Sequence, residues 1–205
     1  MLRRTVTFAF AGLLMAGANL VSQAAYAAPI VKAERPDVKV GDKYTFSCTW
    51  GAQKFEQQNV ITSVDESSIK YTQNGKPLEN TREGNPVKDA RFTYSDRRNL
   101  SFPLEVGKKW TFTDDWARFD PPLHGSAKAN VTVASYEKVR VPAGEFDAFK
   151  IERTADFRVA ETGSSGTNTG VHWYAPAART NVKRVTYIVG EPEFTCELKE
   201  FQLQP

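Results

Sequence analysis

The segment that most constrains the fold is a glycine turn followed by an alternating strand, and the chain contains it twice. Val40-Gly41-Asp42-Lys43-Tyr44-Thr45-Phe46-Ser47 recurs 66 residues later as Val106-Gly107-Lys108-Lys109-Trp110-Thr111-Phe112-Thr113. In each copy an aromatic residue and a phenylalanine stand two positions apart, which is the period of a half-buried β-strand. Trp50 and Trp116 keep the same spacing. The repeat therefore predicts two related β-meanders, about 38–103 and 104–201.

The remaining segments follow the same period, and none has the pattern of an amphipathic helix. Asn74-Gly75 and Val141-Pro142-Ala143-Gly144 are turn sequences between alternating runs. The stretches 76–90 and 114–125 are polar or rich in proline, and we expect loops there. Each meander would have one apolar face, so both faces should enclose one core. We predict an all-β fold of antiparallel meanders that form a curled sheet, an open barrel or a sandwich, with 28–205 as a single domain.

The N-terminal residues have the features of an export signal. Two arginines at positions 3 and 4 precede an apolar run that extends to Leu20, and Ala25-Tyr26-Ala27 is a small-x-small cleavage sequence. We expect residues 1–27 to be a signal peptide that is removed after Ala27. No later apolar run is long enough to span a bilayer. The predicted location of the mature chain is the periplasm or the exterior of the cell.

The charge balance changes when this leader is removed. The full chain has 27 basic and 24 acidic residues. Because the leader holds two arginines and no acid, the mature chain keeps 25 basic against 24 acidic residues. It has no run of lysine or arginine that could follow a phosphate backbone, so nucleic acid is not an expected partner.

The two cysteines, Cys48 and Cys196, predict a disulfide bond, because an isolated pair in an exported protein is most simply oxidised. Cys48 shares the strand parity of Tyr44 and Phe46, and Cys196 shares that of Leu198, so both sulfur atoms should face the core. The bond would join the first strand to the last. The alternative is two buried free thiols.

Four segments of the second half carry turn and strand signatures, namely Val141-Pro142-Ala143-Gly144-Glu145-Phe146-Asp147-Ala148-Phe149-Lys150-Ile151, Trp173-Tyr174-Ala175-Pro176, Val182-Lys183-Arg184 and Glu197-Leu198. Together with the Val-Gly-x-Lys-Trp motif at Val106, these segments resemble an uncharacterised family of exported bacterial proteins. The resemblance implies a β-rich exported domain without assigning a reaction. The periplasmic lipoprotein carriers, with a curled sheet around an apolar cavity, offer a more distant analogy of architecture.

Catalytic and metal-binding patterns are weak in this sequence. The two histidines are His124 and His172, and no Gly-x-Ser-x-Gly motif is present. His124 could join a nearby aspartate at a metal, but the spacing is not that of a ligand set. We therefore expect no metal, no cofactor and no catalytic residues. A hydrolase would require one of the histidines to meet an acid and a nucleophile in one cleft.

The aromatic residues give the more useful prediction. Rings in strands usually form the core, but some can line a cavity for an apolar or amphipathic ligand. The leading hypothesis is a non-enzymatic binding protein for a lipid-like molecule or an envelope component. The alternative is a structural or protein-interaction module without a small ligand, and an internal cavity would distinguish the two. The candidate ligand-binding residues are Trp116, Arg118, Phe119, His124 and Trp173.

Overall fold

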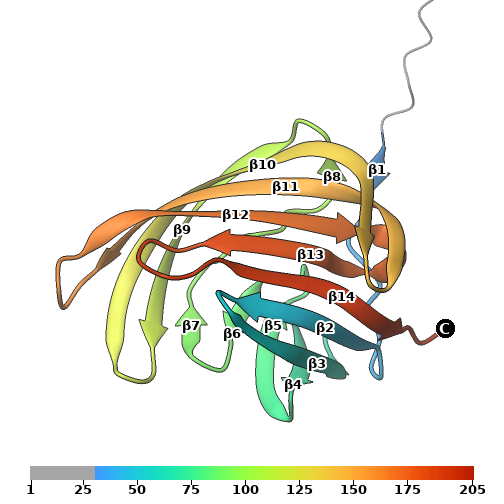
Figure 1. The fold of residues 1–205 in the computed structure, drawn as a ribbon, viewed down its shortest axis with the longest axis horizontal. Helices are drawn as coiled ribbons and strands as arrows, with labels where there is room; N and C mark the ends of the chain where they lie inside the picture. Colours follow the sequence, from blue (N-terminus) through green and yellow to red (C-terminus); the bar gives the residue numbers. More distant parts are fainter. Residues whose placement is uncertain (1–30) are drawn as a thin grey trace, which may run out of the picture.

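The computed structural model describes residues 31–205, which are mostly β-strand (Figure 1). The predicted signal peptide and its cleavage site lie outside the described residues. The only helical segment among residues 31–205 is a short 3-10 helix, η1 (Pro176–Ala178). The strands are β1 (Lys32–Ala33), β2 (Lys43–Trp50), β3 (Gln53–Val64), β4 (Ser68–Gln73), β5 (Lys76–Thr81), β6 (Pro86–Lys88), β7 (Phe92–Tyr94), β8 (Leu104–Glu105), β9 (Lys109–Arg118), β10 (Leu123–Val141), β11 (Gly144–Val159), β12 (Ser165–Ala175), β13 (Thr180–Tyr187) and β14 (Phe194–Gln202).

The strands form one closed antiparallel barrel and a separate small sheet. Going around the barrel, the order is β10-β11-β12-β13-β14-β2-β3-β4-β5-β6-β7-β9, and β9 pairs again with β10. The small sheet is the pair β1 and β8. Figure 1 shows β10 to β14 as curved strands on one side and β2 to β7 on the other. The predicted all-β antiparallel fold class is confirmed, and the sheet closes.

The two sequence copies have the same local geometry. Gly41 and Gly107 have φ of 91° and 89°, a region that favours glycine because it has no Cβ. The Gly41 amide donates to the Ile61 carbonyl at 2.9 Å, and the Gly107 amide donates to the Val133 carbonyl at 2.8 Å. A shift of register follows each acceptor. In both places a glycine turn leads directly into a long barrel strand.

The barrel interior is built from alternate residues of each strand and contains two apolar clusters. One cluster includes Tyr44, Phe46 and the two cysteines, together with Leu198. The other includes buried residues of β9 to β12, of the small sheet β1 and β8, and Leu100. Its residues are Ala33, Leu100, Leu104, Phe112, Ala129, Val131, Val133, Phe149, Ile151, Ala155 and Tyr174. Burial of these side chains supplies the main stabilisation of the fold.

The predicted disulfide is confirmed. Cys48 on β2 and Cys196 on β14 stand directly opposite each other, with their Cα atoms 4.1 Å apart and a sequence separation of 148. Both are fully buried. Because β14 pairs with β2, the bond joins the first and last long strands of the barrel.

Two expected loops are strands in the structure. The stretch 114–125 continues β9 as far as Arg118 and begins β10 at Leu123, so only four residues form the connection. The stretch 76–90 contains β5 and β6. In the first case the error has a clear cause, because Asp114 occupies an inward position where a charged residue is rare. The turns at Asn74-Gly75 and Pro142-Ala143 are confirmed as two-residue hairpin connections.

Candidate functional site

A cavity of about 220 Å³ lies inside the barrel. Strands β2 to β6 form one part of its wall, and β12 and β13 form another. Residues between the strands, at 36–38, 83–84, 99–100 and 179, complete it. The lining residues are Pro36, Val38, Tyr44, Phe46, Asn59, Ile61, Ile69, Tyr71, Gln73, Asn80, Glu83, Gly84, Pro86, Asn99, Leu100, His172, Tyr174, Arg179, Thr180, Asn181 and Arg184. The wall therefore combines aromatic rings with amide and charged groups.

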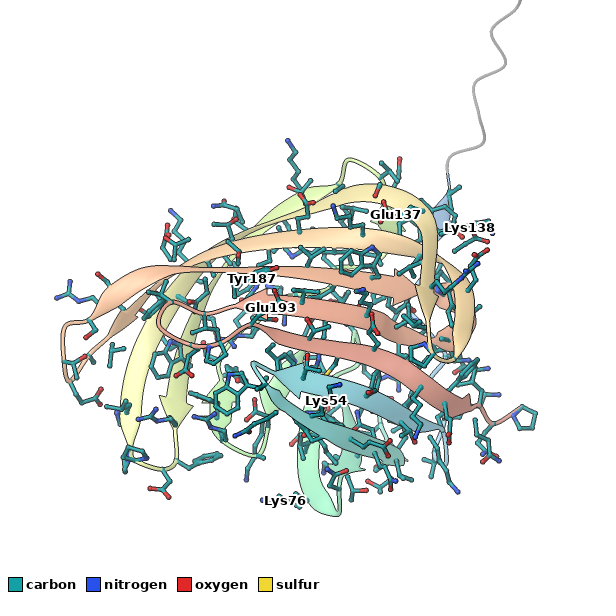
Figure 2. The ribbon with its side chains drawn as sticks, in the orientation of Figure 1. Lys54, Lys76, Glu137, Lys138, Tyr187 and Glu193 are labelled. Atoms are coloured by element: carbon teal, nitrogen blue, oxygen red, sulfur yellow. A yellow bond between two sulfur atoms is a disulfide. The ribbon has the colours of Figure 1, made fainter. Side chains whose placement is uncertain are left out.

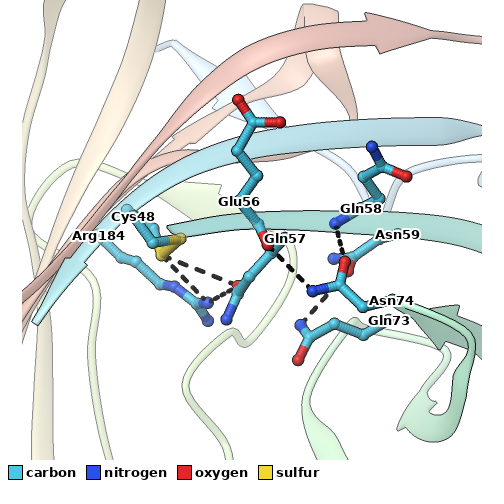
Figure 3. Close-up of a disulfide and its surroundings, with 9 residues drawn as sticks. Cys48, Glu56, Gln57, Gln58, Asn59, Gln73, Asn74 and Arg184 are labelled. Atoms are coloured by element: carbon cyan, nitrogen blue, oxygen red, sulfur yellow. Dashed lines mark hydrogen bonds between the residues drawn. A yellow bond between two sulfur atoms is a disulfide. The ribbon is translucent and has the colours of Figure 1, made fainter. Parts of the chain in front are cut away.

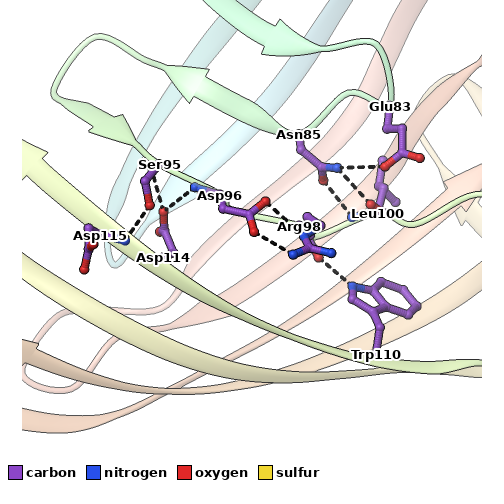
Figure 4. Close-up of polar contacts among 9 residues, drawn as sticks. All are labelled: Glu83, Asn85, Ser95, Asp96, Arg98, Leu100, Trp110, Asp114 and Asp115. Carbon is purple, nitrogen blue, oxygen red and sulfur yellow. Dashed lines mark hydrogen bonds and ion pairs between the residues drawn. The ribbon is translucent and has the colours of Figure 1, made fainter.

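Asn85 holds the segment at Asn99 and Leu100 in place. Its side-chain amide donates to the Leu100 carbonyl at 2.8 Å, and its side-chain oxygen accepts from the Leu100 amide at 2.7 Å (Figure 4). Asn85 is 1% exposed. A buried side chain that satisfies both backbone groups of one residue fixes this part of the cavity wall.

Three tyrosines supply the aromatic part of the wall. Burial raises the pKa of Tyr71 to about 12 and also raises the pKa values of Tyr44 and Tyr174. All three phenols are therefore neutral at physiological pH. The ring of Tyr174 also packs edge-on against Phe102, with 5.2 Å between the centroids. The rings present apolar faces to the cavity and can also form hydrogen bonds.

The polar part of the wall has unused hydrogen-bonding capacity. The side-chain oxygens of Asn80, Asn99, Asn181 and Tyr44 are buried and have no hydrogen-bond partner among residues 31–205. Buried polar atoms in folded proteins are normally paired. Four unpaired oxygens on residues that line one cavity make this wall suited to a ligand with polar groups.

Arg184 on β13 is a cationic group of the wall, and it stands opposite His172 on the neighbouring strand β12. The Arg184 guanidinium donates to the Gln57 side-chain oxygen at 2.7 Å and more weakly to the Cys196 sulfur at 3.6 Å (Figure 3). It also lies 5.0 Å from the centre of the Phe194 ring. Its contacts are thus an amide, a sulfur atom and a ring. Burial lowers its pKa.

His172 is uncharged in this environment. Burial lowers its pKa to about 3, and the positive charges of Arg153 and Arg184 act in the same direction. Gly170 lies next to this histidine. A Cβ on Gly170 would lie 3.7 Å from His172 Nε2 and 3.8 Å from Arg153 Nε, so Arg153 and His172 approach the same point.

Of the predicted binding residues, the structure brings Trp116 and His124 together. They line an open groove of about 610 Å³ at β7, β9 and β10, away from the cavity inside the barrel. The Trp116 ring covers Gly125 on the neighbouring strand, where any Cβ would lie 2.2 Å from the indole. Phe92 packs edge-on against the same indole, 5.9 Å away. Trp116 therefore has a packing role on this wall of the groove.

His124 lies on β10 and not in a loop, and it has an acidic partner. Its ring Nδ1 is 2.7 Å from Glu161 Oε1, and its backbone amide donates to the same carboxylate. The His124 side chain is 68% exposed. The ring has no hydrogen bond to a hydroxyl group among residues 31–205, and both cysteines are oxidised. The acid and the base of a hydrolase meet here, but no nucleophile is positioned with them.

The other three predicted residues do not line the cavity or the groove. Arg118, at the end of β9, donates to the Pro121 carbonyl at 3.0 Å. Phe119 is 44% exposed, with the Lys88 ammonium 5.8 Å from its ring. Trp173 on β12 donates its indole N–H to Glu137 at 2.8 Å, and Figure 2 shows Glu137 on the curved part of β10. The five residues are therefore not one site.

Asp114 is a buried charge with a structural partner. Its carboxylate accepts from the Arg97 Nε at 2.8 Å. It also accepts from the backbone amides of Ser95 and Asp96 at 3.1 and 3.3 Å (Figure 4). Its neighbour Asp115 is exposed, as expected for adjacent residues in a strand. Among residues 31–205, no group of three or more histidine, cysteine, aspartate or glutamate side chains could hold a metal ion.

The cavity residues were missed in the sequence, although one signal was present. On β13, Val182, Arg184 and Thr186 share a parity, so a strand whose Val182 faces inward must also direct Arg184 inward. An arginine at an inward position is the kind of residue that deserves a functional test. The proximity of Arg184 to Arg153 and His172 depends on which strands pair, and the sequence alone does not predict that pairing.

Fold and cavity define an all-β barrel with a small internal chamber. Similar solved structures include a protein from Bacteroides fragilis, described as exported and with a YmcC-like fold. Its TM-score is 0.54 at 15% identity, and the match covers 83% of this chain and 99% of that one. A protein from Parabacteroides distasonis, described as a lipoprotein, gives a TM-score of 0.52 at 13% identity with the same coverage. These similarities establish the YmcC-like fold.

No protein-family model matches this chain, and no curated protein matches it. Among residues 31–205, the structure contains no helix long and apolar enough to cross a membrane.

Proposed function

We propose that this chain is an exported, non-enzymatic binding protein that holds a small amphipathic molecule inside its barrel. The observation that carries the proposal is the internal cavity, whose wall combines tyrosine rings with buried polar atoms that lack partners. Aromatic surface suits the apolar part of a ligand, and a few placed polar groups suit the other part. A wholly hydrophobic ligand would leave those polar atoms unpaired.

The cavity volume limits the size of the ligand. At about 220 Å³, it lies below the roughly 300 Å³ at which typical pockets for drug-sized molecules begin. It therefore suits a small molecule, or one end of a longer one such as a lipid-like envelope component. The predicted leader and the disulfide both support a periplasmic location.

The direct test is native mass spectrometry of the mature protein purified from its own periplasm, compared with its denatured mass. We expect additional mass that is released on denaturation, and the released compound identifies the ligand class. A second preparation with the cavity filled by Ile69→Trp should carry less of it, provided that the circular dichroism spectrum is unchanged. A wild-type protein with no extra mass, and with no affinity for added amphiphiles, would contradict the proposal.

The outer groove is the second candidate binding face. It is open to solvent, and it contains Trp116 and His124, two of the residues singled out in the sequence. If ligand binds there, alanine at Trp116 and His124 should weaken retention without changing the far-UV spectrum. If retention is the same, the groove is not the ligand site. If neither the cavity nor the groove binds a small molecule, the chain would instead act as a protein-interaction module, with an envelope protein as its partner.

A further inference from the structure

The barrel interior contains two arginines whose positive charges are not neutralised by a neighbouring carboxylate. Arg184 and Arg153 lie on inward positions of β13 and β11. No carboxylate among residues 31–205 lies within the 4.0 Å of an ion pair from either guanidinium. The Nε atom of Arg153 is buried and has no hydrogen-bond partner in this part of the chain. Isolated buried charges are costly, so proteins rarely keep them without a role.

The acids that face these arginines are already engaged. Asp89 is the acid that acts on Arg184, and its carboxylate accepts from two backbone amides and from the Tyr94 hydroxyl at 2.7 to 2.8 Å. Asp114 acts on Arg153, but it is bonded to Arg97. Neither acid is free to form an ion pair with Arg153 or Arg184.

The other charged groups on the cavity wall leave this excess in place. Arg179 is 3.5 Å from the buried carboxylate of Asp42, so its charge is compensated. Glu83 is 3.5 Å from the side-chain amide of Asn85. Burial lowers the pKa of Arg153 to about 10, and the nearby charge of Arg97 lowers it further, while Tyr94 and Asp114 act in the opposite direction.

We infer that the ligand carries an oxyanion, a carboxylate or a phosphate, and that Arg184 and His172 on the cavity wall bind it together with Arg153, which lies beside His172 but does not itself line the cavity. Guanidinium groups form strong charge-assisted hydrogen bonds to both kinds of oxyanion. The neutral His172 ring lies between the arginines in the strand order and can donate one N–H. Gly170 leaves room at this point, because it places no side chain beside Arg153 and His172. The inference rests on the proposed function and specifies the charge of its ligand.

The test uses three probes with the purified mature protein: octanoate, octan-1-ol and inorganic phosphate, each titrated by calorimetry. Octanoate and octan-1-ol have the same chain length and differ in charge. We expect octanoate to bind at least about tenfold more tightly than octan-1-ol. Arg184→Gln and Arg153→Gln should each reduce octanoate affinity by about tenfold or more. Arg140→Gln is the matched control, because Arg140 is 84% exposed on the outside, and it should bind as wild type does.

The outcomes separate this inference from the proposed function. Equal affinity for octanoate and octan-1-ol would overturn the oxyanion site and leave an amphiphile-binding barrel. Binding of inorganic phosphate with the same arginine dependence, and without octanoate binding, would support the oxyanion site and overturn the amphipathic ligand. Absence of binding by all three probes would overturn both.

A folding control accompanies the variants. Arg184→Lys keeps the charge and should retain part of the octanoate affinity, although it loses the planar donor geometry. If Arg184 has only a structural role, its replacement by glutamine should lower the melting temperature. A binding residue with uncompensated charge should leave it equal or raise it. A fall in melting temperature together with unchanged octanoate affinity would therefore contradict the assignment.

Discussion

Asp114 and Arg97 form a buried ion pair with 2.8 Å between Oδ2 and each of two guanidinium nitrogens. The Arg97 guanidinium also stacks on the Tyr94 ring, 3.9 Å from its centre. Asp114 lies on β9, whereas Arg97 and Tyr94 belong to the chain at and after β7. The pair therefore fixes the segment after β7 against the strand that closes the barrel.

Asp114→Asn should destabilise the protein by about 3 kcal/mol, because Arg97 would keep a buried charge without its partner. Urea unfolding followed by circular dichroism measures this change. The matched control is Asp115→Asn, at the exposed neighbouring position, for which we expect a change within about 0.5 kcal/mol. Equal effects of the two substitutions would show that the buried pair has no special role in stability.

Removal of the disulfide with Cys48→Ser and Cys196→Ser should lower the free energy of unfolding by about 4 kcal/mol, given the long loop that the bond closes. Thermal unfolding of the variant and of reduced wild type should give similar midpoints below that of the oxidised protein. If the oxidised and reduced proteins melt at the same temperature, the bond does not constrain the unfolded chain as expected.

His172 predicts a loss of stability in acid. Its folded-state pKa of about 3 lies below the unfolded value of about 6.5, so the unfolded chain takes up the proton first. Above about pH 6.5, His172 is neutral in both the folded and the unfolded chain, so it does not lower the free energy of unfolding. As the pH falls from there toward 3, stability should decline by up to about 1.4 kcal/mol per pH unit. His172→Gln should show a shallower decline in denaturant unfolding measured across this range, and an identical slope would exclude a neutral buried His172.

Gly125→Ala should destabilise the barrel by about 1–3 kcal/mol through overpacking. The new Cβ would lie 2.2 Å from the Trp116 indole and 2.4 Å from the Arg158 carbonyl oxygen, and the backbone oxygen cannot move aside without disturbing β11. Gly170→Ala is the control, because its nearest neighbour would be 3.6 Å away and no positive φ is involved. Comparison of the two melting temperatures decides whether the close contact at Trp116 matters.

The strands and the disulfide could be predicted because alternation in a strand fixes the face of every residue. Once Phe46 is placed inward, Cys48 must also face inward, and the same reasoning places Cys196 with Leu198. The Asn74-Gly75 turn was predictable because its two residues tolerate positive φ, and they have φ of 49° and 81°.

The cavity and the charges inside it could not be predicted in this way. They depend on which strands become neighbours, and the pairing of β14 with β2 joins residues far apart in the chain. Asp114 falls in a stretch expected to be a loop, and the inward position of Arg184 is not expected because charged side chains usually lie on the surface. The predicted binding residues were selected for aromatic and charged character in one segment. Trp173 joined them on composition alone, and the structure places it elsewhere.

The position of β14 has a consequence for the order in which the protein can be assembled. Among residues 31–205, β14 (Phe194–Gln202) comes latest in sequence, and it supplies the pairing between β13 and β2. Until these nine residues are available, β13 and β2 both have unpaired edges, and Cys48 has no partner. Because synthesis proceeds from N-terminus to C-terminus, the strands that precede β14 stay an open sheet, and barrel closure and thiol oxidation both wait for β14.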